Sequence, residues 1–295
     1  MASLLALLHV AISGIAVGCI YALVALGFVL IYKATETVNF AQGELMMLGA
    51  FAGFALVQLL GVPYLLAVVI AIVLVGGIGV AIERVAIRPI LGQPQFSLLM
   101  LTIGLGYVAR GAITLAPPFG AETHALPTPY KGQILRFAGL ALGTDQLVVI
   151  SATALLCALL YAMFRFTKIG IAMQATSQNQ LAAYYMGIPV RSLNGLVWGL
   201  SAGVAAIAGL LLAPLTFVHV NMGFLGLKAF PAAVIGGLGS LPGAVVGGLM
   251  IGLVESFAGF YLPEGAKDIA AYVVVLLMLM IKPTGIFGET QRKKV

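Results

Sequence analysis

Residues 35–44, TETVNFAQGE, form a polar interruption between two long apolar runs. The segment lacks the glycine and proline density of a surface turn, has Lys33 as its only nearby basic residue, and continues directly into apolar sequence. Backbone groups freed inside a membrane must be satisfied by protein or by a water-filled cavity, because lipid offers them no partners. The segment therefore predicts a break within a membrane-embedded body. The alternative is a short cytoplasmic turn in which Glu44 is an ordinary helix-start residue.

The composition on either side of this break is that of a membrane protein. Of the 295 residues, 62% are hydrophobic and 8% are charged, whereas about a quarter of the residues in a soluble domain are charged. The predicted fold class is an all-α polytopic membrane protein, a single domain over residues 1–295 with about eight to nine transmembrane helices and one or two broken or re-entrant segments. The apolar runs lie near residues 9–32, 43–60, 63–82, 96–116, 146–164, 192–213, 243–262 and 268–282, and a shorter glycine-rich run near 224–238 either spans or re-enters.

The net charge of +6 indicates orientation in the membrane and does not point to a nucleic-acid partner. Most basic residues fall at loop ends that alternating crossings place on one side: Lys33, Arg84, Arg88, Arg165, Lys168, Arg191, Lys282 and residues 292–294. That side is predicted to be the cytoplasm. If the glycine-rich run crosses the membrane, the N-terminus lies outside and the C-terminus inside. The apolar start of the chain has no basic region before it, so a retained first helix is expected.

No catalytic residue and no metal site is predicted. Cys19 and Cys157 stand in apolar runs with no CxxC or Cys/His spacing, and we interpret them as small core residues. His9, His124 and His219 have no metal-ligand spacing, and no base lies near a candidate nucleophile. An intramembrane enzyme therefore has little support.

The polar residues of the break are candidates to line a translocation pathway. Asn39 and Gln42 supply neutral hydrogen-bonding groups, and the dipole of the following helix favours a carboxylate at Glu44. The Gly-rich stretch 229–243 is a second candidate gate. The glycines that follow it, Gly247, Gly248 and Gly252, are better explained by tight helix packing. The predicted pathway residues are Asn39, Gln42, Gly43, Glu44, Asn221, Gly236 and Gly237.

A weak internal symmetry relates the two regions. The pattern Val38–Phe40 and Gly43 after one apolar run is matched by Val220–Met222 and Gly223 after another. Five crossings separate the two copies, so they would face opposite ways, as inverted repeats of transporters do. A chance match is the alternative.

Four ionisable residues stand in or beside apolar runs: Arg110, His219, Lys228 and Glu255. Such residues mark function by default, because each costs at least ~2.5 kcal/mol at the bilayer centre. Each can also be placed near a helix end, so snorkelling to the interface or a structural ion pair is the favoured interpretation. No coupling-ion or proton-relay set emerges from them.

The longest cytoplasmic segment is residues 165–191. Residues 172–186 contain neither glycine nor proline and are predicted to form one short helix, which Gly187 and Pro189 terminate. A short helix with small and polar faces suits a groove on another protein. The alternative, an amphipathic connector resting on lipid, is disfavoured because its middle is uncharged and has few bulky residues.

Several of these segments together resemble the LivH-type permeases of bacterial ABC importers for branched-chain amino acids. The likeness covers nearly the whole chain and is carried by residues 18–33 leading into 38–44, by 83–84 and 88–89, by 167–188 and by 228–248. The NFAQGE run and the Gly-rich stretch are specific only in combination. At Gln174 the family commonly has arginine, which puts in doubt any salt bridge to an ATPase at that point.

The resemblance implies an importer subunit and its partners. It implies a second, LivM-type permease, two ABC ATPase subunits, a periplasmic substrate-binding protein and a location in the bacterial inner membrane. It also implies a coupling role toward the ATPase for Gly170, Ala172, Ala175, Asn179, Ala183 and Gly187. The chain has no GxxxxGK[ST] motif, so no cofactor is expected in it, and ATP and Mg²⁺ would bind the partner ATPases.

Two other functions remain open. One is a self-contained secondary transporter or channel for small solutes, although the scarcity of paired intramembrane acids counts against ion coupling. The other is an ABC permease for urea or short amides, since likeness of fold does not select a substrate.

Overall fold

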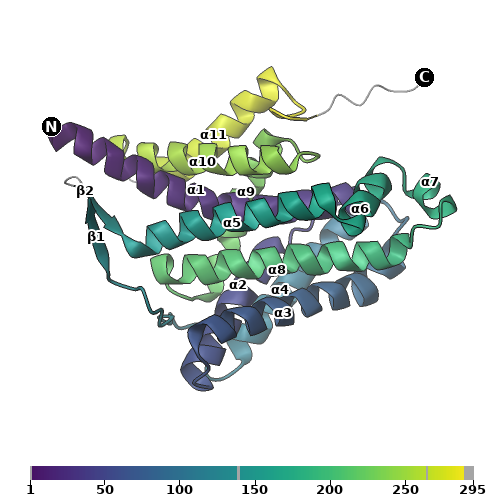
Figure 1. Cartoon of the computed structure of the whole chain (residues 1–295), viewed down its shortest axis with the longest axis horizontal. Coiled ribbons are helices and arrows are strands. Elements are labelled where there is room, and N and C mark those ends of the chain that lie inside the picture. The colour runs from purple at the N-terminus through teal and green to yellow at the C-terminus, as the bar shows by residue number, and fades with distance from the viewer. Residues whose placement is uncertain (1, 138–139, 264, 289–295) are drawn as a thin grey trace.

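The computed structural model describes residues 2–137, 140–263 and 265–288, which fold into eleven α-helices and one small hairpin (Figure 1). The elements are α1 (Ala2–Thr35), α2 (Gln42–Phe54, continued by a π-helical turn over Ala55–Leu59), α3 (Tyr64–Ile82, continued by short turns to Ile90), α4 (Gln95–Leu115), β1 (Ile134–Phe137), β2 (Leu140–Gly143), α5 (Thr144–Phe166), α6 (Lys168–Gln178), α7 (Gln180–Tyr185), α8 (Val190–Thr216), α9 (Gly223–Gly236), α10 (Leu241–Tyr261) and α11 (Ala266–Ile281).

The predicted fold class is confirmed. Among the described residues, seven helices are long and apolar enough to cross a membrane. They are α1, α2 with its π turn, α3, α4, α5, α8 and α10. The expected eight to nine spans therefore resolve into seven long helices plus two shorter ones, α9 with 14 residues and α11 with 16. The chain is a multi-pass membrane protein.

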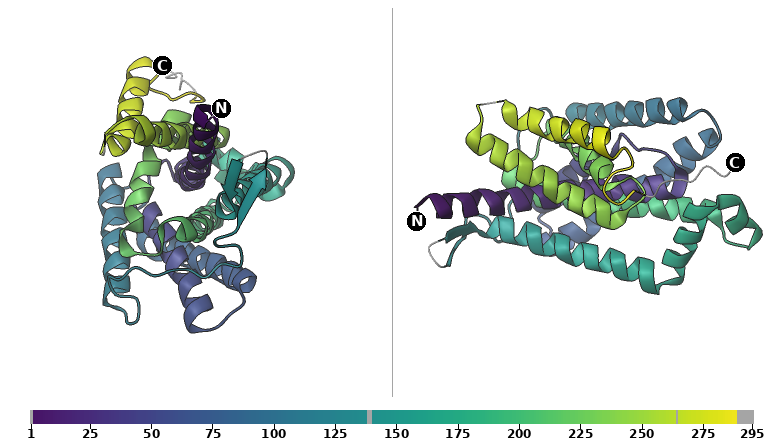
Figure 2. Two further views of the ribbon diagram at one scale, coloured as in Figure 1. Left: turned by 90° about the vertical axis from the view of Figure 1, so that its left-hand side faces the viewer. Right: turned by 90° about the horizontal axis from the view of Figure 1, so that it is seen from above.

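The two ends of the bundle differ in structure. At one end, which we call the hairpin end, β1 and β2 pair antiparallel and lie beside the start of α1 (Figure 2). There His9 Nε2 lies 2.7 Å from the carbonyl oxygen of Ala141. At the other end, which we call the α6–α7 end, Gln180 donates a hydrogen bond of 2.6 Å to the carbonyl oxygen of Ala34. The hairpin lies between the apolar runs predicted near residues 96–116 and 146–164, where no strand is predicted.

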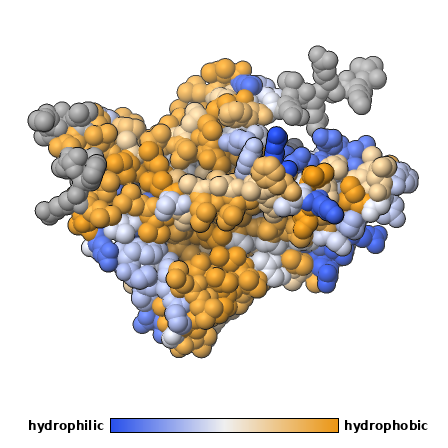
Figure 3. Space-filling model, viewed as in Figure 1, coloured by the Kyte–Doolittle hydropathy of each residue, from blue (hydrophilic) through white to orange (hydrophobic). Residues whose placement is uncertain are grey.

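Small residues bring the central helices together. Helices α1 and α10 cross so closely that a Cβ on Gly248 would overlap Ala22, and one on Gly252 would overlap Gly18. The prediction that the glycines past Gly243 serve tight packing is thus confirmed for these positions. Helices α1 and α8 are mostly buried, whereas α3, α4 and α5 are mostly exposed and apolar. Hydrophobic residues accordingly cover much of the molecular surface, and polar ones gather toward the α6–α7 end and at the lower left of the view (Figure 3).

Candidate functional site

The polar interruption after α1 lies inside the bundle. The chain leaves α1 at Thr35 and begins α2 at Gln42, whose side chain contacts Gly27 of α1 and Ser201 of α8. Gly27 is eight residues before the end of α1, about 12 Å along a helix that rises 1.5 Å per residue. Asn39 is 1% exposed and Gln42 is 0% exposed. The predicted break within the body of the protein is therefore present, and the alternative of a short cytoplasmic turn is wrong, although Glu44 does stand in the first turn of α2.

A buried hydrogen-bond network holds this break in place. Gln42 Nε2 donates to the carbonyl oxygen of Ser201 at 3.2 Å, and Ser201 Oγ donates to Gln42 Oε1 at 3.1 Å. Ser201 Oγ also lies 2.9 Å from the carbonyl oxygen of Gly27, and Asn39 Nδ2 donates to Gln42 Oε1 at 3.3 Å. The Phe40 amide donates to Thr102 Oγ1 of α4 at 3.2 Å. Side chains from three helices thus supply the partners that lipid could not.

The N-terminus of α9 meets the N-terminus of α2. After α8 ends at Thr216, the chain turns back and begins α9 at Gly223. A Cβ on Gly43 would overlap the carbonyl oxygen of Gly223, and a Cβ on Gly226 would overlap the backbone of Gly43. We call this contact the half-helix junction. It exists because glycine on both helices lets the two backbones touch.

The two half-helices lead away from the junction in opposite directions. Helix α2 leads toward the hairpin end, where Tyr64 at the start of α3 and Tyr130 share a hydrogen bond of 2.8 Å. Helix α9 leads toward the α6–α7 end, where Gly236 packs on Gly243 at the start of α10. A long helix, a break and a half-helix thus occur twice with opposite orientation, which is the inverted arrangement that the sequence pattern predicts.

An ion pair lies beside the junction. Arg110 of α4 donates to Glu44 Oε1 at 2.7 Å, and the two side chains are 16% and 13% exposed. The Arg110 guanidinium also lies 4.0 Å from the centre of the Phe224 ring on α9. Glu44 stands in the first turn of α2 and lies against Gly223, so the dipoles of both half-helices favour its negative charge. Arg110 is therefore a structural pair, as favoured from the sequence.

Lys228 and Glu255 also form a pair. Lys228 Nζ of α9 lies 3.3 Å from Glu255 Oε1 of α10 and 2.5 Å from Asp268 Oδ1 of α11. Glu255 is 2% exposed and also accepts a hydrogen bond from Tyr21 of α1. The network therefore connects α9 to three neighbouring helices.

The predicted coupling segment is two helices rather than one. The expected single helix over residues 172–186 is wrong, because Asn179 leaves the helical conformation and caps α7 by accepting a hydrogen bond from the Ala182 amide at 2.9 Å. Asparagine favours this position, since its short side chain competes with the helix for backbone donors. The predicted stop is confirmed: Gly187 follows α7 with a φ of 82°.

The surface that this segment offers differs from the predicted one. Gly170 and Ala183 are buried, Ala172 and Ala175 are half-buried, and Asn179 is exposed. Large hydrophobic side chains are also exposed on and just after α7: Leu181, Tyr184, Tyr185 and Met186. Gln174 donates to the carbonyl oxygen of Phe164 at 2.9 Å, so it ties α6 to α5.

Comparison with known proteins identifies the family. The family described as "Branched-chain amino acid transport system / permease component" matches residues 10–282. The chain belongs to this family. The permease is 32% identical to the high-affinity branched-chain amino acid transport system permease protein LivH of Escherichia coli K12, over 96% of each chain. It is 31% identical to the corresponding protein BraD of Pseudomonas aeruginosa, again over 96% of each chain. The resemblance stated from the sequence motifs is thereby confirmed.

More distant comparisons agree. A probable branched-chain amino acid transport permease protein LivH of Methanocaldococcus jannaschii is 29% identical over 92% of this permease and 89% of that protein. A chain in the structure of PsaBC from Streptococcus pneumoniae in complex with Fab has a TM-score of 0.51 and covers 93% of the permease and 92% of that chain. At 16% identity this likeness concerns the fold alone.

The structure gathers some of the predicted pathway residues and separates others. Asn39, Gln42, Gly43 and Glu44 meet at the junction, and Asn221 is exposed two residues before α9 begins. Gly236 and Gly237 lie at the far end of α9, packed on α10 and on residues near Gly285. Sequence patterns did not single out Thr102 and Ser201, included Gly226 and Phe230 only as members of the glycine-rich segments 224–238 and 229–243, and marked Arg110 only as ionisable. The centre of the Phe230 ring lies 5.6 Å from that of Phe28, in an edge-to-face arrangement, and 5.5 Å from that of Phe40, with the two rings tilted.

Proposed function

We propose that this permease is the membrane-spanning subunit of an ATP-driven importer that moves branched-chain amino acids across the bacterial inner membrane. The observation that carries the proposal is the half-helix junction, which places two opposed helix N-termini and a polar network inside a permease-family bundle. The names of the relatives support the substrate class. The distribution of basic residues supports a cytoplasmic α6–α7 end.

The pathway is proposed to pass the junction. Asn39, Gln42 and Ser201 offer hydrogen-bonding groups there, and the Phe28, Phe40 and Phe230 rings offer an apolar surface on the side toward the α6–α7 end. Such a combination suits an amino acid with a polar backbone and an apolar side chain. Tilting α2 against α9 would open or close the passage between them.

The energy is proposed to come from partners. The chain carries no P-loop sequence, so ATP and Mg²⁺ would bind two ABC ATPase subunits, and a second related permease and a periplasmic substrate-binding protein would complete the importer. The exposed apolar tip of α7, from Leu181 to Met186, supports docking to such an ATPase, because aromatic residues and methionine are typical of interface cores. The chain itself would hold no cofactor.

The test is reconstitution with partners. Tagged permease is purified from native membranes, its co-purifying proteins are identified, and uptake of labelled leucine into proteoliposomes is measured with and without ATP on the ATPase side. ATP-dependent uptake, inhibited by isoleucine and valine but not by urea or acetamide, is the expected result. Leucine uptake by the chain alone, driven by an ion gradient, would instead establish a secondary transporter.

A substitution at Gly187 tests the coupling role. At a φ of 82° a β-branched residue is strained by about 1–2 kcal/mol, so Gly187→Val should turn the tip of α7 out of place. A strain of this size lowers the population of the native arrangement about fivefold or more, so uptake is expected to fall by the same factor. The ATPases should still co-purify and hydrolyse ATP. The matched control is Gly187→Asn, because asparagine tolerates positive φ. Equal uptake by the two variants would contradict the coupling role.

A further inference from the structure

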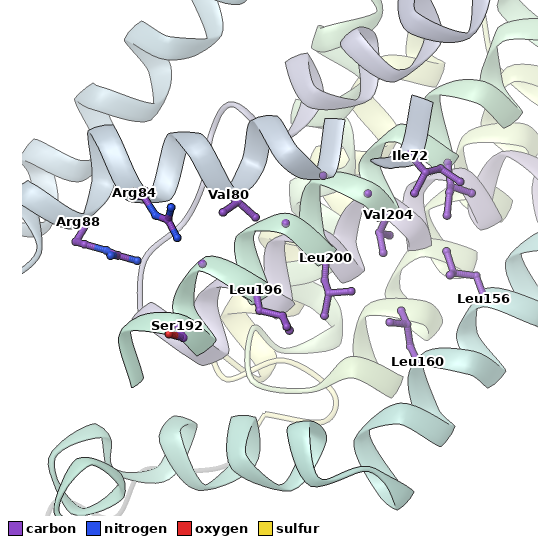
Figure 4. Close-up of a pocket in the computed structure, with 15 residues that line it drawn as sticks. Ile72, Val80, Arg84, Arg88, Leu156, Leu160, Ser192, Leu196, Leu200 and Val204 are labelled. Carbon is purple, nitrogen blue, oxygen red and sulfur yellow. The ribbon is translucent and has the colours of Figure 1, made fainter. Parts of the chain in front are cut away.

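A groove of about 600 Å³ runs along the outside of the bundle between α3, α5 and α8, away from the half-helix junction (Figure 4). Its walls are apolar side chains, which include Ile72, Val80, Leu156, Leu160, Leu200 and Val204. The groove is deep over α8 because Gly195, Gly199 and Gly203, which are spaced four residues apart on one face of that helix, have no side chains. Nothing in the proposed transport path uses this groove.

The groove has the length of one bilayer leaflet. Arg84 and Arg88 stand at one end, and Ile72 and Leu156 stand at the other (Figure 4). Ile72 and Arg84 are twelve residues apart on one helical segment, which is about 18 Å at 1.5 Å per residue. The hydrocarbon core of a bilayer is about 30 Å thick, so one leaflet is about 15 Å. An occupant lying along the groove would therefore reach from the α6–α7 end toward the bilayer centre.

The two arginines at the groove mouth differ in their partners. Arg88 is neutralised by Glu83, with contacts of 2.7 Å and 3.2 Å, and also donates to the carbonyl oxygen of Arg191. The exposed Arg84 side chain has no hydrogen-bond or ion-pair partner among the described residues. One uncompensated positive charge therefore stands where an apolar groove reaches the basic end of the bundle.

We propose that this groove binds an anionic phospholipid of the cytoplasmic leaflet, with one acyl chain along α3 and α8 and its phosphate against Arg84. Basic pockets between transmembrane helices on the cytoplasmic side are suited to anionic headgroups. The apolar walls of the groove would make van der Waals contacts along the acyl chain. A free phosphate would leave the apolar length of the groove unused. Occupation of the groove by a helix of a partner is the alternative outcome, which the second test below detects.

The first test measures lipid retention by native mass spectrometry of the purified full-length permease, with phosphatidylglycerol as the anionic probe and phosphatidylcholine as the zwitterionic comparison. Wild type should retain phosphatidylglycerol preferentially. Arg84→Gln should lower that affinity about fivefold, the effect of roughly one cation near a headgroup. The matched control is Arg165→Gln, which removes another exposed cation at the same end but outside the groove. Equal losses in the two variants would show diffuse surface attraction and overturn the proposal.

The second test fills the groove. A Cβ on Gly203 would make only an ordinary contact of 3.5 Å with Ile72, so Gly203→Leu should place its side chain in the groove without a backbone clash. Gly77→Leu is the matched control, because Gly77 faces open space on α3 and does not line the groove. Phosphatidylglycerol retention is expected to fall in Gly203→Leu only. Unchanged phosphatidylglycerol retention in Gly203→Leu would overturn the proposal. If Gly203→Leu instead lost a second permease from the purified complex while it kept the lipid, the groove would be a contact surface for that permease, and the proposal would also be overturned.

Discussion

An Arg110→Leu permease is expected to lose about 3–5 kcal/mol of stability and most of its uptake, because Glu44 would remain buried at the half-helix junction without its cation. The dipoles of α2 and α9 offset part of this cost, but they do not replace a guanidinium 2.7 Å away. The loss would also remove the contact between Arg110 and Phe224, which ties α4 to α9.

The measurement is denaturant unfolding of the purified permease in detergent, together with leucine uptake by the reconstituted importer. A double variant, Glu44→Gln with Arg110→Gln, should be less destabilised than Arg110→Leu alone, since it leaves no buried charge unpaired. Arg165→Leu, an exposed arginine outside the junction, serves as the control for loss of a positive charge. If Arg110→Leu and Arg165→Leu were equally stable, the ion pair would have no role in holding the junction.

A Gly226→Val permease is expected to transport at least about tenfold less than wild type. A destabilisation of the packed arrangement of α2 and α9 by about 1.4 kcal/mol lowers its population by that factor. The valine Cβ would overlap the Cα atom of Gly43, and no side-chain rotation can relieve the clash, because Cβ is fixed by its own backbone and the Cα atom is part of one. Overpacking of this kind costs about 1–3 kcal/mol. The two half-helices would therefore separate.

Uptake by the reconstituted importer is the measurement, with Gly104→Val as the matched control. Gly104 lies within α4, and a Cβ there meets nothing within 4 Å, so the control carries the same change in helix propensity without the clash. No second substitution at Gly43 can make room for the valine, because no residue is smaller than glycine. Normal uptake by Gly226→Val would show that transport does not depend on close approach of the half-helices.

The sequence by itself determined the membrane class, the family and the places where the chain breaks. Long apolar runs commit a chain to helices in lipid, because every backbone group must find its partner within its own segment. Where polar residues such as Asn39 and Gln42 interrupt such a run, the same rule requires that they be enclosed by protein, and the structure encloses them. These features are local and can be recognised without knowing what packs against them.

Only the tertiary structure decided which residues meet. Gln42 finds Ser201, 159 residues away, and Glu44 finds Arg110, 66 residues away, and neither partner carries a local signal that names the other. Likewise, glycines are common throughout the chain, and only the opposed packing of α2 and α9 makes Gly43 and Gly226 the ones that touch. The division of the coupling segment at Asn179 follows the same principle. The hydrogen bond from the asparagine side chain competes with continued helix, and the packing around the residue decides which of the two conformations is more stable. Local pattern fixes where a polar or small residue is needed, and packing between distant segments fixes what it is needed for.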